Sequence, residues 1–336
     1  MKKKILILYT GGTIGMLVSK QGYRPAVGYL QQAMQQITML QNEDMPNYEI
    51  HEYNPLIDSA DAEPELWNYI ANDILENYYQ YDGFLILHGT DTMAYTASAL
   101  SFMLKNIAKP IMLTGSQVPL GLTKTDAREN LINSLYLLQH YPILEVTVYF
   151  NNLLFRGNRV TKVNATSYDA FSSPNFPPLI KMATQVEKEF DSYLQPEGDL
   201  IFTKMKPGQF TYLLLFPGID PCYVENLMTL PLQALIIKSY GTGNAPSKNK
   251  QLLRSLKSLN DKEVVLVNSS QCLQGSVHMR DYATGQALYD CGAISGHDMT
   301  NEALLCKLFY LFSLDLPTAS IKNKLNQNIA GELSLN

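Results

Sequence analysis

The feature of this chain that most constrains its fold is a pattern that occurs twice: a short apolar run leads directly into glycines and hydroxyl side chains. The first run, residues 5–9, continues as TGGTIG at residues 10–15, and the second, residues 84–87, continues as HGTDT at residues 88–92. Each copy is typical of a buried parallel strand that opens into a glycine-rich loop and is followed by helix-like sequence. Because ligands of open α/β sheets bind at the carboxyl ends of strands, we expect both loops to face one crevice. The second loop adds the carboxylate of Asp91. Hydroxyl side chains next to a carboxylate in one crevice indicate an active site with a threonine nucleophile.

Strand-like and helix-like segments alternate along the first half of the chain, which predicts a mostly parallel sheet flanked by helices. Asp61 and Thr125 stand where helix caps are needed. We expect strands at residues 5–9, 48–53, 84–87, 111–113 and 146–150, and helices at residues 63–79, 92–104 and 126–139.

Five prolines between residues 172 and 207 interrupt this alternation and indicate irregular chain at a domain connection. We therefore expect an α/β fold with two domains: a larger N-terminal catalytic domain (residues 1–190), a linker (191–207) and a smaller C-terminal α/β domain (208–336). Alternation resumes in the smaller domain at residues 212–216, 224–227, 235–238, 247–259 and 264–267, followed by helical patterns at 286–289, 302–312 and 318–326.

The composition excludes several classes of protein. Hydrophobic residues make up 46% of the 336-residue chain and charged residues 17%, as in ordinary globular proteins. The formal net charge of −5 gives no electrostatic reason to expect nucleic acid or a membrane as a partner. Lysines precede the first apolar run, but this run is too short for an export signal, which favours a cytoplasmic protein. The four cysteines and five histidines are scattered, so we expect reduced, mostly buried thiols and neither a metal nor another cofactor.

The two loops allow a catalytic and a purely structural interpretation. Gly11 and Gly12 let the backbone approach a ligand closely, and their spacing matches no phosphate-binding motif, but a strand-end turn explains them equally well. In the second loop, the side chain of Thr90 or Asp91 could simply cap the following helix. Lys162 is a candidate base for a threonine, although an ordinary lysine is solvated and protonated at neutral pH.

Four motifs taken in order carry a family resemblance. They are TGGTIG at residues 10–15, IDSAD at 57–61, HGTDTMAYTASAL at 88–100 and LTGSQVP at 113–119, and together they resemble the L-asparaginase/glutaminase family. Three further segments look most like its bacterial cytoplasmic type I branch: RGNRVTK at 156–162, SYGTGNAP at 239–246 and NSSQC at 268–272.

The resemblance implies hydrolysis of L-asparagine to L-aspartate and ammonia. Thr13 matches the family's nucleophilic threonine. Tyr23 matches a tyrosine on the mobile loop over the site, which helps to orient or deprotonate the nucleophile. Thr90, Asp91 and Lys162 match a second catalytic cluster, which serves as a proton relay.

Other positions match residues that hold the substrate. Asp58 and Ser59 match those that grip the α-amino and α-carboxylate groups of the substrate. An ammonium group requires carboxylates, and a carboxylate requires N–H or O–H donors such as those at a helix N-terminus. The implied substrate-binding set is Gly12, Asp58, Ser59, Thr90, Asp91, Ser116 and Asn244, with Asn244 supplied by a neighbouring subunit.

The resemblance also implies assembly and a second ligand site. The family forms homo-oligomers, so we expect a dimer or a dimer of dimers, that is, a homotetramer. The type I branch can carry an allosteric asparagine site, which Thr161 and Cys272 match. Lys238 stands where an arginine is expected, and a lysine cannot make the same bidentate contact to a carboxylate.

Two alternative functions share these motifs. One is the asparaginase-like subunit of glutamyl-tRNA amidotransferase, which usually carries an extra N-terminal domain, whereas TGGTIG here begins at Thr10. The other is a non-catalytic sensor that binds an amino acid on the same scaffold. A sensor has no need to keep Thr13 together with Thr90, Asp91 and Lys162, which favours the enzyme.

Overall fold

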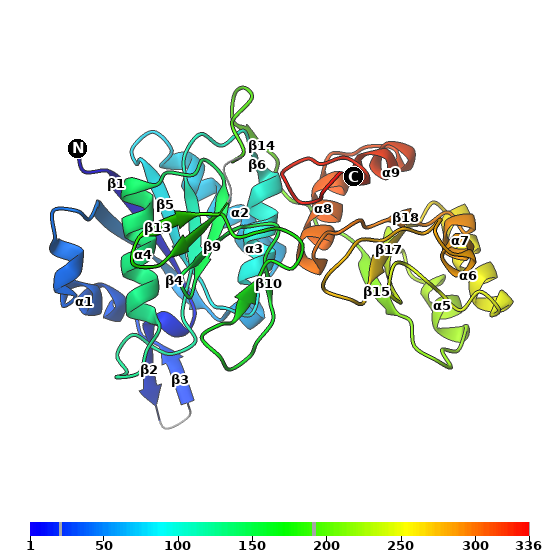
Figure 1. The fold of residues 1–336 in the computed structure, drawn as a ribbon, viewed down its shortest axis with the longest axis horizontal. Helices are drawn as coiled ribbons and strands as arrows, with labels where there is room; N and C mark the ends of the chain where they lie inside the picture. Colours follow the sequence, from blue (N-terminus) through cyan, green and yellow to red (C-terminus); the bar gives the residue numbers. More distant parts are fainter. Residues whose placement is uncertain (20–21, 190–192, 336) are drawn as a thin grey trace. The chain divides into compact units, whose positions relative to one another are not determined.

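The computed structural model describes residues 1–19, 22–189 and 193–335, which divide into two compact units (Figure 1). The first unit is Met1–Met205 and the second is Lys206–Asn336. The boundary between them falls within the predicted linker at residues 191–207, of which residues 191 and 192 lie outside the described residues. The limits of the two domains and of the linker remain a prediction.

The first unit is built on an eight-stranded sheet with the order β13-β12-β9-β8-β7-β5-β1-β4. The five strands β4, β1, β5, β7 and β8 run parallel, and the remaining pairs are antiparallel. The predicted mostly parallel sheet is therefore confirmed. Its strands are β1 (Lys4–Gly11), β4 (Asn47–Ile57), β5 (Gly83–Leu87), β7 (Ile111–Thr114), β8 (Val146–Phe150), β9 (Leu153–Arg156), β12 (Ile180–Met182) and β13 (Val186–Lys188).

Helices flank this sheet and give the unit its core (Figure 1). Because side chains alternate along a strand, Ile5, Ile7 and Tyr9 of β1 point to one face, where they pack with residues of α1 and α4. The central strands are fully buried, which explains their uninterrupted apolar sequence. The helices of the unit are α1 (Tyr29–Gln35), α2 (Pro64–Glu76), α3 (Met93–Met103) and α4 (Ala127–His140).

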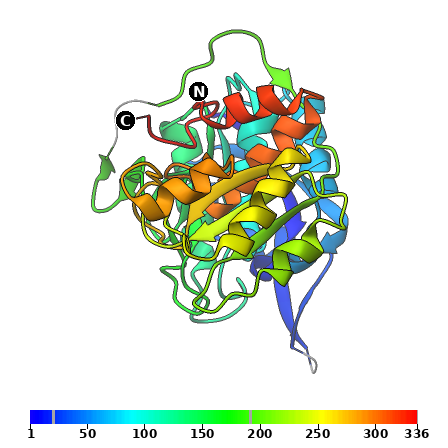
Figure 2. The same cartoon turned by 90° about the vertical axis from the view of Figure 1, so that its right-hand side faces the viewer.

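The secondary structure that follows the first glycine-rich loop differs from the prediction. Instead of a helix, a single turn of 3-10 helix (Thr13–Gly15) leads into a hairpin of β2 (Met16–Ser19) and β3 (Gly22–Pro25). This hairpin projects from the rest of the unit in both views (Figures 1 and 2). The local sequence does not predict it because its pairing depends on two four-residue strands without a clear apolar alternation.

Two cap predictions also have different outcomes. The hydroxyl of Thr125 accepts a hydrogen bond from the backbone N–H of Ala127, 3.0 Å away, at the start of α4. Asp61 instead belongs to a 3-10 turn (Ser59–Asp61), and α2 begins without a capping side chain. Short strands also pair outside the main sheet: β6 (Leu104–Lys105) pairs with β14 (Ile201–Phe202), and β10 (Thr161–Lys162) pairs with β11 (Phe171–Ser172).

The second unit has a four-stranded sheet in the order β15-β16-β17-β18, and all its pairs are parallel. Apolar side chains of β15, β16 and β17 pack against α5, α6 and α7, which face the viewer in Figure 2. The elements are β15 (Phe210–Leu214), α5 (Cys222–Leu227), β16 (Ala234–Ser239), α6 (Lys250–Asp261), β17 (Val265–Ser270), α7 (Ala283–Asp290), β18 (Ile294–Ser295), α8 (Asn301–Ser313) and α9 (Thr318–Leu325). The predicted smaller α/β domain is confirmed.

All four cysteines are free, but only Cys291 and Cys306 are buried, so the expectation of mostly buried thiols is half right. Cys222 and Cys272 are exposed. Within the described ranges, none of the helices is both long enough and apolar enough to cross a bilayer.

Candidate active site

The carboxyl ends of β4, β1 and β5 bring three loops into direct contact. A Cβ atom on Gly11 would lie 2.1 Å from the Ile57 carbonyl oxygen, and one on Gly12 would lie 2.4 Å from the Gly89 nitrogen. A Cβ on Gly89 would in turn meet the Ser59 hydroxyl oxygen at 2.3 Å. Gly11 and Gly12 have φ values of 136° and 87°, which favour glycine. The loops after these strands therefore converge, as the strand-end argument predicts.

This convergence brings Thr13 and Thr90 into one neighbourhood. Each of them follows one of the two glycines whose backbones touch, Gly12 and Gly89. Since consecutive Cα atoms are about 3.8 Å apart, the Cα atoms of Thr13 and Thr90 lie within about 13 Å of each other. The two threonine side chains and a ligand the size of an amino acid can together bridge such a separation. Thr13 is half-buried, and the Thr90 side chain is buried.

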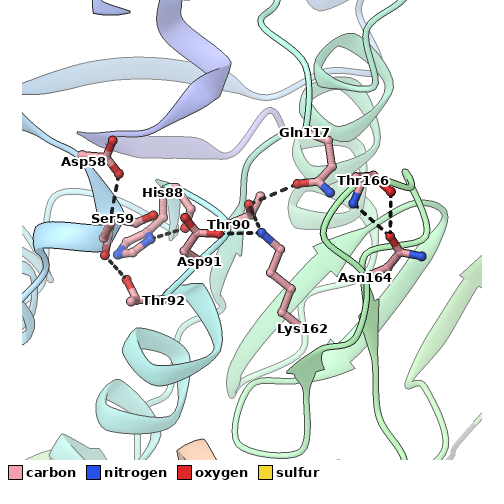
Figure 3. A network of polar contacts seen from close by, with 12 residues as sticks. Asp58, Ser59, His88, Thr90, Asp91, Thr92, Gln117, Lys162, Asn164 and Thr166 are labelled. Carbon is pink, nitrogen blue, oxygen red and sulfur yellow. Dashed lines mark hydrogen bonds and ion pairs between the residues drawn. The ribbon is translucent and has the colours of Figure 1, made fainter. Parts of the chain in front are cut away.

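Thr90, Asp91 and Lys162 form one hydrogen-bonded cluster (Figure 3). The Lys162 ammonium donates to the Thr90 hydroxyl oxygen at 2.8 Å and to Asp91 Oδ1 at 2.7 Å. The Lys162 side chain is 18% exposed, whereas that of Asp91 is 62% exposed. The lysine thus reaches inward from β10, 71 residues away in sequence from Asp91, and is not a solvated surface residue.

The helix-cap interpretation of the second loop is wrong. The N-cap of α3 is Thr92, and no side chain makes a capping hydrogen bond there. The Thr92 hydroxyl donates instead to the Ser59 carbonyl oxygen at 2.8 Å, which ties the start of α3 to the loop after β4. The side chains of Thr90 and Asp91 are consequently available to Lys162.

Asp58 and Ser116 border the same cluster of loops. The Asp58 carboxylate accepts a hydrogen bond from the Ala60 N–H at 3.0 Å and is otherwise exposed (Figure 3). The buried Ser116 hydroxyl donates to the Val118 carbonyl at 2.7 Å, so this side chain is engaged within its own loop. A Cβ on Gly115 would lie 2.3 Å from the His88 carbonyl, which places the loop after β7 against the loop after β5.

Comparison with known proteins agrees with this arrangement. The family model described as "Asparaginase, N-terminal" matches residues 4–193, and the one described as "Glutaminase/Asparaginase C-terminal domain" matches residues 211–325. The chain belongs to the asparaginase family. The four motifs at residues 10–15, 57–61, 88–100 and 113–119 are thus the segments that build the converging loops.

Individual relatives of this asparaginase cover its full length. It is 49% identical over 335 residues to L-asparaginase 1 of Escherichia coli K12, covering 99% of this chain and 98% of the relative. The crystal structure of L-asparaginase I from Vibrio cholerae matches with a TM-score of 0.93 and 44% identity, covering 100% of both chains. A glutamyl-tRNA(Gln) amidotransferase protein of Methanobrevibacter smithii is more distant, with 31% identity over 99% of this chain and 77% of the relative.

Tyr23 follows the first of the converging loops of this asparaginase. It lies in β3 of the projecting hairpin, its side chain is 51% exposed, and among the described residues no hydrogen bond joins it to Thr13. Its role in orienting the nucleophile remains a prediction, because the arrangement seen here does not bring the two side chains into hydrogen-bond contact.

Two residues near the cluster were missed by the sequence reasoning. His88 is fully buried, and burial lowers the pKa of its imidazole. Its Nδ1–H donates to the Gly89 carbonyl at 2.7 Å, so Nε2 accepts from the Thr96 hydroxyl at 3.0 Å. A neutral histidine thus fixes the backbone next to Thr90. Gln117, which contacts Thr90, stands inside the LTGSQVP motif, and its position after a buried strand was the signal that could have identified it.

The remaining predicted ligand residues lie in both units. Thr161 is buried in β10 of the first unit. In the second, Lys238 of β16 donates to Ser269 Oγ at 3.0 Å and to Asn301 Oδ1 at 2.6 Å. Burial lowers the Lys238 pKa to about 8, although Glu302 and nearby Cys272 oppose this shift.

The predicted substrate-binding residue of the second unit, Asn244, accepts a hydrogen bond from the Thr284 hydroxyl at 2.7 Å. Across the described parts of the chain, no three histidine, cysteine or acidic side chains are arranged to hold a metal ion.

Proposed function

We propose that this asparaginase hydrolyses L-asparagine to L-aspartate and ammonia, with Thr13 as the nucleophile and Thr90, Asp91 and Lys162 as a proton relay. The observation that carries the proposal is the contact of the Lys162 ammonium with both Thr90 and Asp91, next to the loop that bears Thr13. L-asparaginase relatives that match the whole chain support the same reaction.

The substrate is a zwitterion, and the loops offer a partner for each of its charges. The exposed carboxylates of Asp58 and Asp91 suit the α-ammonium group. The Ser59 hydroxyl and the backbone N–H groups at the start of α3 suit the α-carboxylate. The backbone of Gly12 and Ser116 would line the pocket for the side-chain amide, where N–H groups can stabilise an oxyanion.

The chemistry takes place in two steps with balanced protons. The Thr13 oxygen attacks the amide carbon and forms a C–O bond, and its proton passes to the amide nitrogen as the C–N bond breaks and ammonia leaves. Water then attacks the resulting ester. One water proton returns to the Thr13 oxygen as the ester C–O bond breaks, and the remaining hydroxide completes a carboxylic acid, whose proton passes to the released ammonia to leave the carboxylate of aspartate and ammonium. Tyr23 would reach Thr13 when the hairpin moves toward the site.

Lys162 and Thr90 are placed to move protons between these steps. The lysine holds its ammonium between one neutral and one anionic oxygen, where it can exchange a proton with the Thr90 oxygen. Asp91 compensates the ammonium charge and fixes the position of the lysine.

We extend the proposal to assembly, location and regulation. We expect a cytoplasmic homo-oligomer, a dimer or a tetramer, in which Asn244 of a neighbouring subunit completes the site. Thr161, Lys238 and Cys272 remain the proposed allosteric set. The lysine makes a point contact to a carboxylate where an arginine makes a bidentate one, so weak cooperativity is expected.

An ammonia-release assay with L-asparagine and L-glutamine tests the proposal. We expect the wild type to release ammonia from L-asparagine, Thr13→Ala to be inactive but folded, and Thr38→Ala, an exposed threonine of a 3-10 turn, to retain activity. Failure of the wild type to hydrolyse either amide would contradict the function, and an active Thr13→Ala would contradict the nucleophile. A sigmoidal dependence on L-asparagine would support the second site.

A further inference from the structure

The backbone of Gln117 is held by a buried carboxylate. Asp126 is 8% exposed and accepts hydrogen bonds from the N–H groups of Gln117, at 2.9 and 3.1 Å, and of Val118, at 3.0 Å. Asn130 donates to the same carboxylate at 3.3 Å. The Gln117 side chain therefore starts from a fixed point at the carboxyl end of β7.

The orientation of the Gln117 amide follows from its two partners. On one side it meets the Ser167 carbonyl oxygen at 3.1 Å, and a carbonyl can only accept. Gln117 Nε2 must therefore face Ser167, which leaves Oε1 toward the Thr90 hydroxyl, 3.2 Å away (Figure 3). Because Oε1 can only accept, the Thr90 hydroxyl is the donor in this contact.

The direction of the Thr90 hydroxyl proton is set by this arrangement. With its proton directed to Gln117, the Thr90 oxygen has its lone pairs free for the Lys162 ammonium, which donates to it at 2.8 Å. The hydrogen bonds thus run in one direction, from Lys162 to Thr90, from Thr90 to Gln117 and from Gln117 to Ser167.

We propose that Gln117 is a positioning residue, which acts through Thr90 by fixing the rotamer of its hydroxyl so that the oxygen lone pairs face the Lys162 ammonium. The inference rests on the proposed function of the Thr90, Asp91 and Lys162 cluster. It gives Gln117 no contact with the substrate, so its loss should slow the chemical step and leave substrate binding nearly unchanged.

A purely structural role does not account for the contact with Thr90. The loop that receives the Gln117 amide has its own supports: Asn164 Oδ1 accepts from the N–H groups of Thr166 and Ser167, each at 2.9 Å. The Tyr168 hydroxyl donates to the Lys124 carbonyl at 3.1 Å. The loop is therefore held at other points, and what the side chain of Gln117 adds for the cluster is an acceptor for Thr90.

The first test compares Gln117→Met with a matched control. Methionine has a similar length but neither accepts from Thr90 nor donates to Ser167, and the backbone contacts to Asp126 persist. The control is Gln80→Met, an exposed glutamine just before the amino end of β5. We expect kcat for L-asparagine to fall about tenfold in Gln117→Met, as for the loss of one hydrogen bond, with KM within about twofold of the wild type. The control should match the wild type.

A double-mutant cycle separates positioning from a general structural effect. In a Thr90→Val background there is no hydroxyl to orient, so Gln117→Met should change the residual kcat by less than about twofold. A second full loss in that background, or a change in KM alone in the single variant, would overturn the proposal.

A second variant covers the case in which Gln117→Met does not fold. Gln117→Glu keeps an acceptor for Thr90 and should retain more kcat than any variant without one, such as Gln117→Leu. Equal kcat in the Glu and Leu variants would overturn the proposal. If the wild type releases no ammonia, the proposed function is wrong. If the wild type and Gln117→Met are equally active, the proposed function stands and only the role of Gln117 is wrong.

Discussion

Replacing Gly89 with alanine tests the contact between the loops after β4 and β5. The backbone of Gly89 lies outside the left-handed region, so alanine can adopt it, and any cost must come from the added methyl group. That methyl carbon would lie 2.3 Å from Ser59 Oγ and 2.6 Å from Ser59 Cβ. Since ordinary contact begins at 3.4 Å, the Ser59 side chain must retreat by 3.4 − 2.3 = 1.1 Å.

The expected consequences follow from this displacement. Overpacking of this kind costs about 1–3 kcal/mol of unfolding free energy. Because Ser59 is buried and is proposed to hold the substrate carboxylate, a shift of about 1 Å should lower kcat/KM on the order of 100-fold. Stability is measured by urea unfolding with the fluorescence of Trp67, the single tryptophan, which is buried in α2 of the same unit.

A second substitution shows whether the clash is the cause. In a Ser59→Gly background both obstructing atoms are gone, and the next atom of residue 59 that the new methyl meets is the backbone nitrogen, at 3.3 Å. Gly89→Ala should then cost little further stability. Wild-type stability and activity in the single Gly89→Ala variant, or an equal loss of stability in both backgrounds, would refute the contact.

Three further substitutions probe charged groups. Lys162→Met should lower kcat about 100- to 10,000-fold. The control is Lys181→Met, which removes a half-exposed lysine of another ion pair and should leave kcat unchanged. Near-normal ammonia release by Lys162→Met would show that Lys162 is not part of the relay. Glu332→Gln removes the charged partner, 2.6 Å away, of the fully buried Lys307 ammonium, which keeps only neutral acceptors such as the Leu325 and Gln327 carbonyls, and should cost about 3–5 kcal/mol in urea unfolding followed by circular dichroism. Adding Lys307→Met should restore part of that loss, and a neutral single variant would contradict the burial. Because the pKa of Lys238 is lowered to about 8 in the folded protein, the unfolded chain binds more protons than the folded one between pH 8 and 10.5. The free energy of unfolding of the wild type, measured against that of Lys238→Met, should therefore rise with pH across that window. A difference that does not change with pH would contradict the lowered pKa.

The strands of the fold were predictable because burial leaves a strong local signal. Residues 5–9 and 84–87 are continuous apolar runs, and both are strands of the parallel centre of the sheet. The β2–β3 hairpin was not predictable, because each strand is only four residues long and β3 is exposed throughout, so burial imposes no alternating apolar pattern. Asp61 was misassigned as a cap because an acidic residue shortly before a helix also suits a 3-10 turn.

The site was predictable only in part from the residues themselves. That the strand-end loops meet follows from the topology of a parallel sheet. The pairing of Lys162 with Asp91 does not, since nothing local to Lys162 indicates a partner 71 residues away, and only the family resemblance suggested it. Gln117 escaped notice for the same reason, because its two partners lie 27 and 50 residues away along the chain.

The most direct test of the account is a search for a covalent intermediate. L-asparagine is mixed with the enzyme, the reaction is stopped with acid within a turnover, and the digested protein is analysed by mass spectrometry. We predict an aspartyl ester on the peptide that contains Thr13, and its absence from that peptide in Thr13→Ala. An ester on the peptide that contains Thr90, or turnover of L-asparagine without any ester, would contradict Thr13 as the nucleophile.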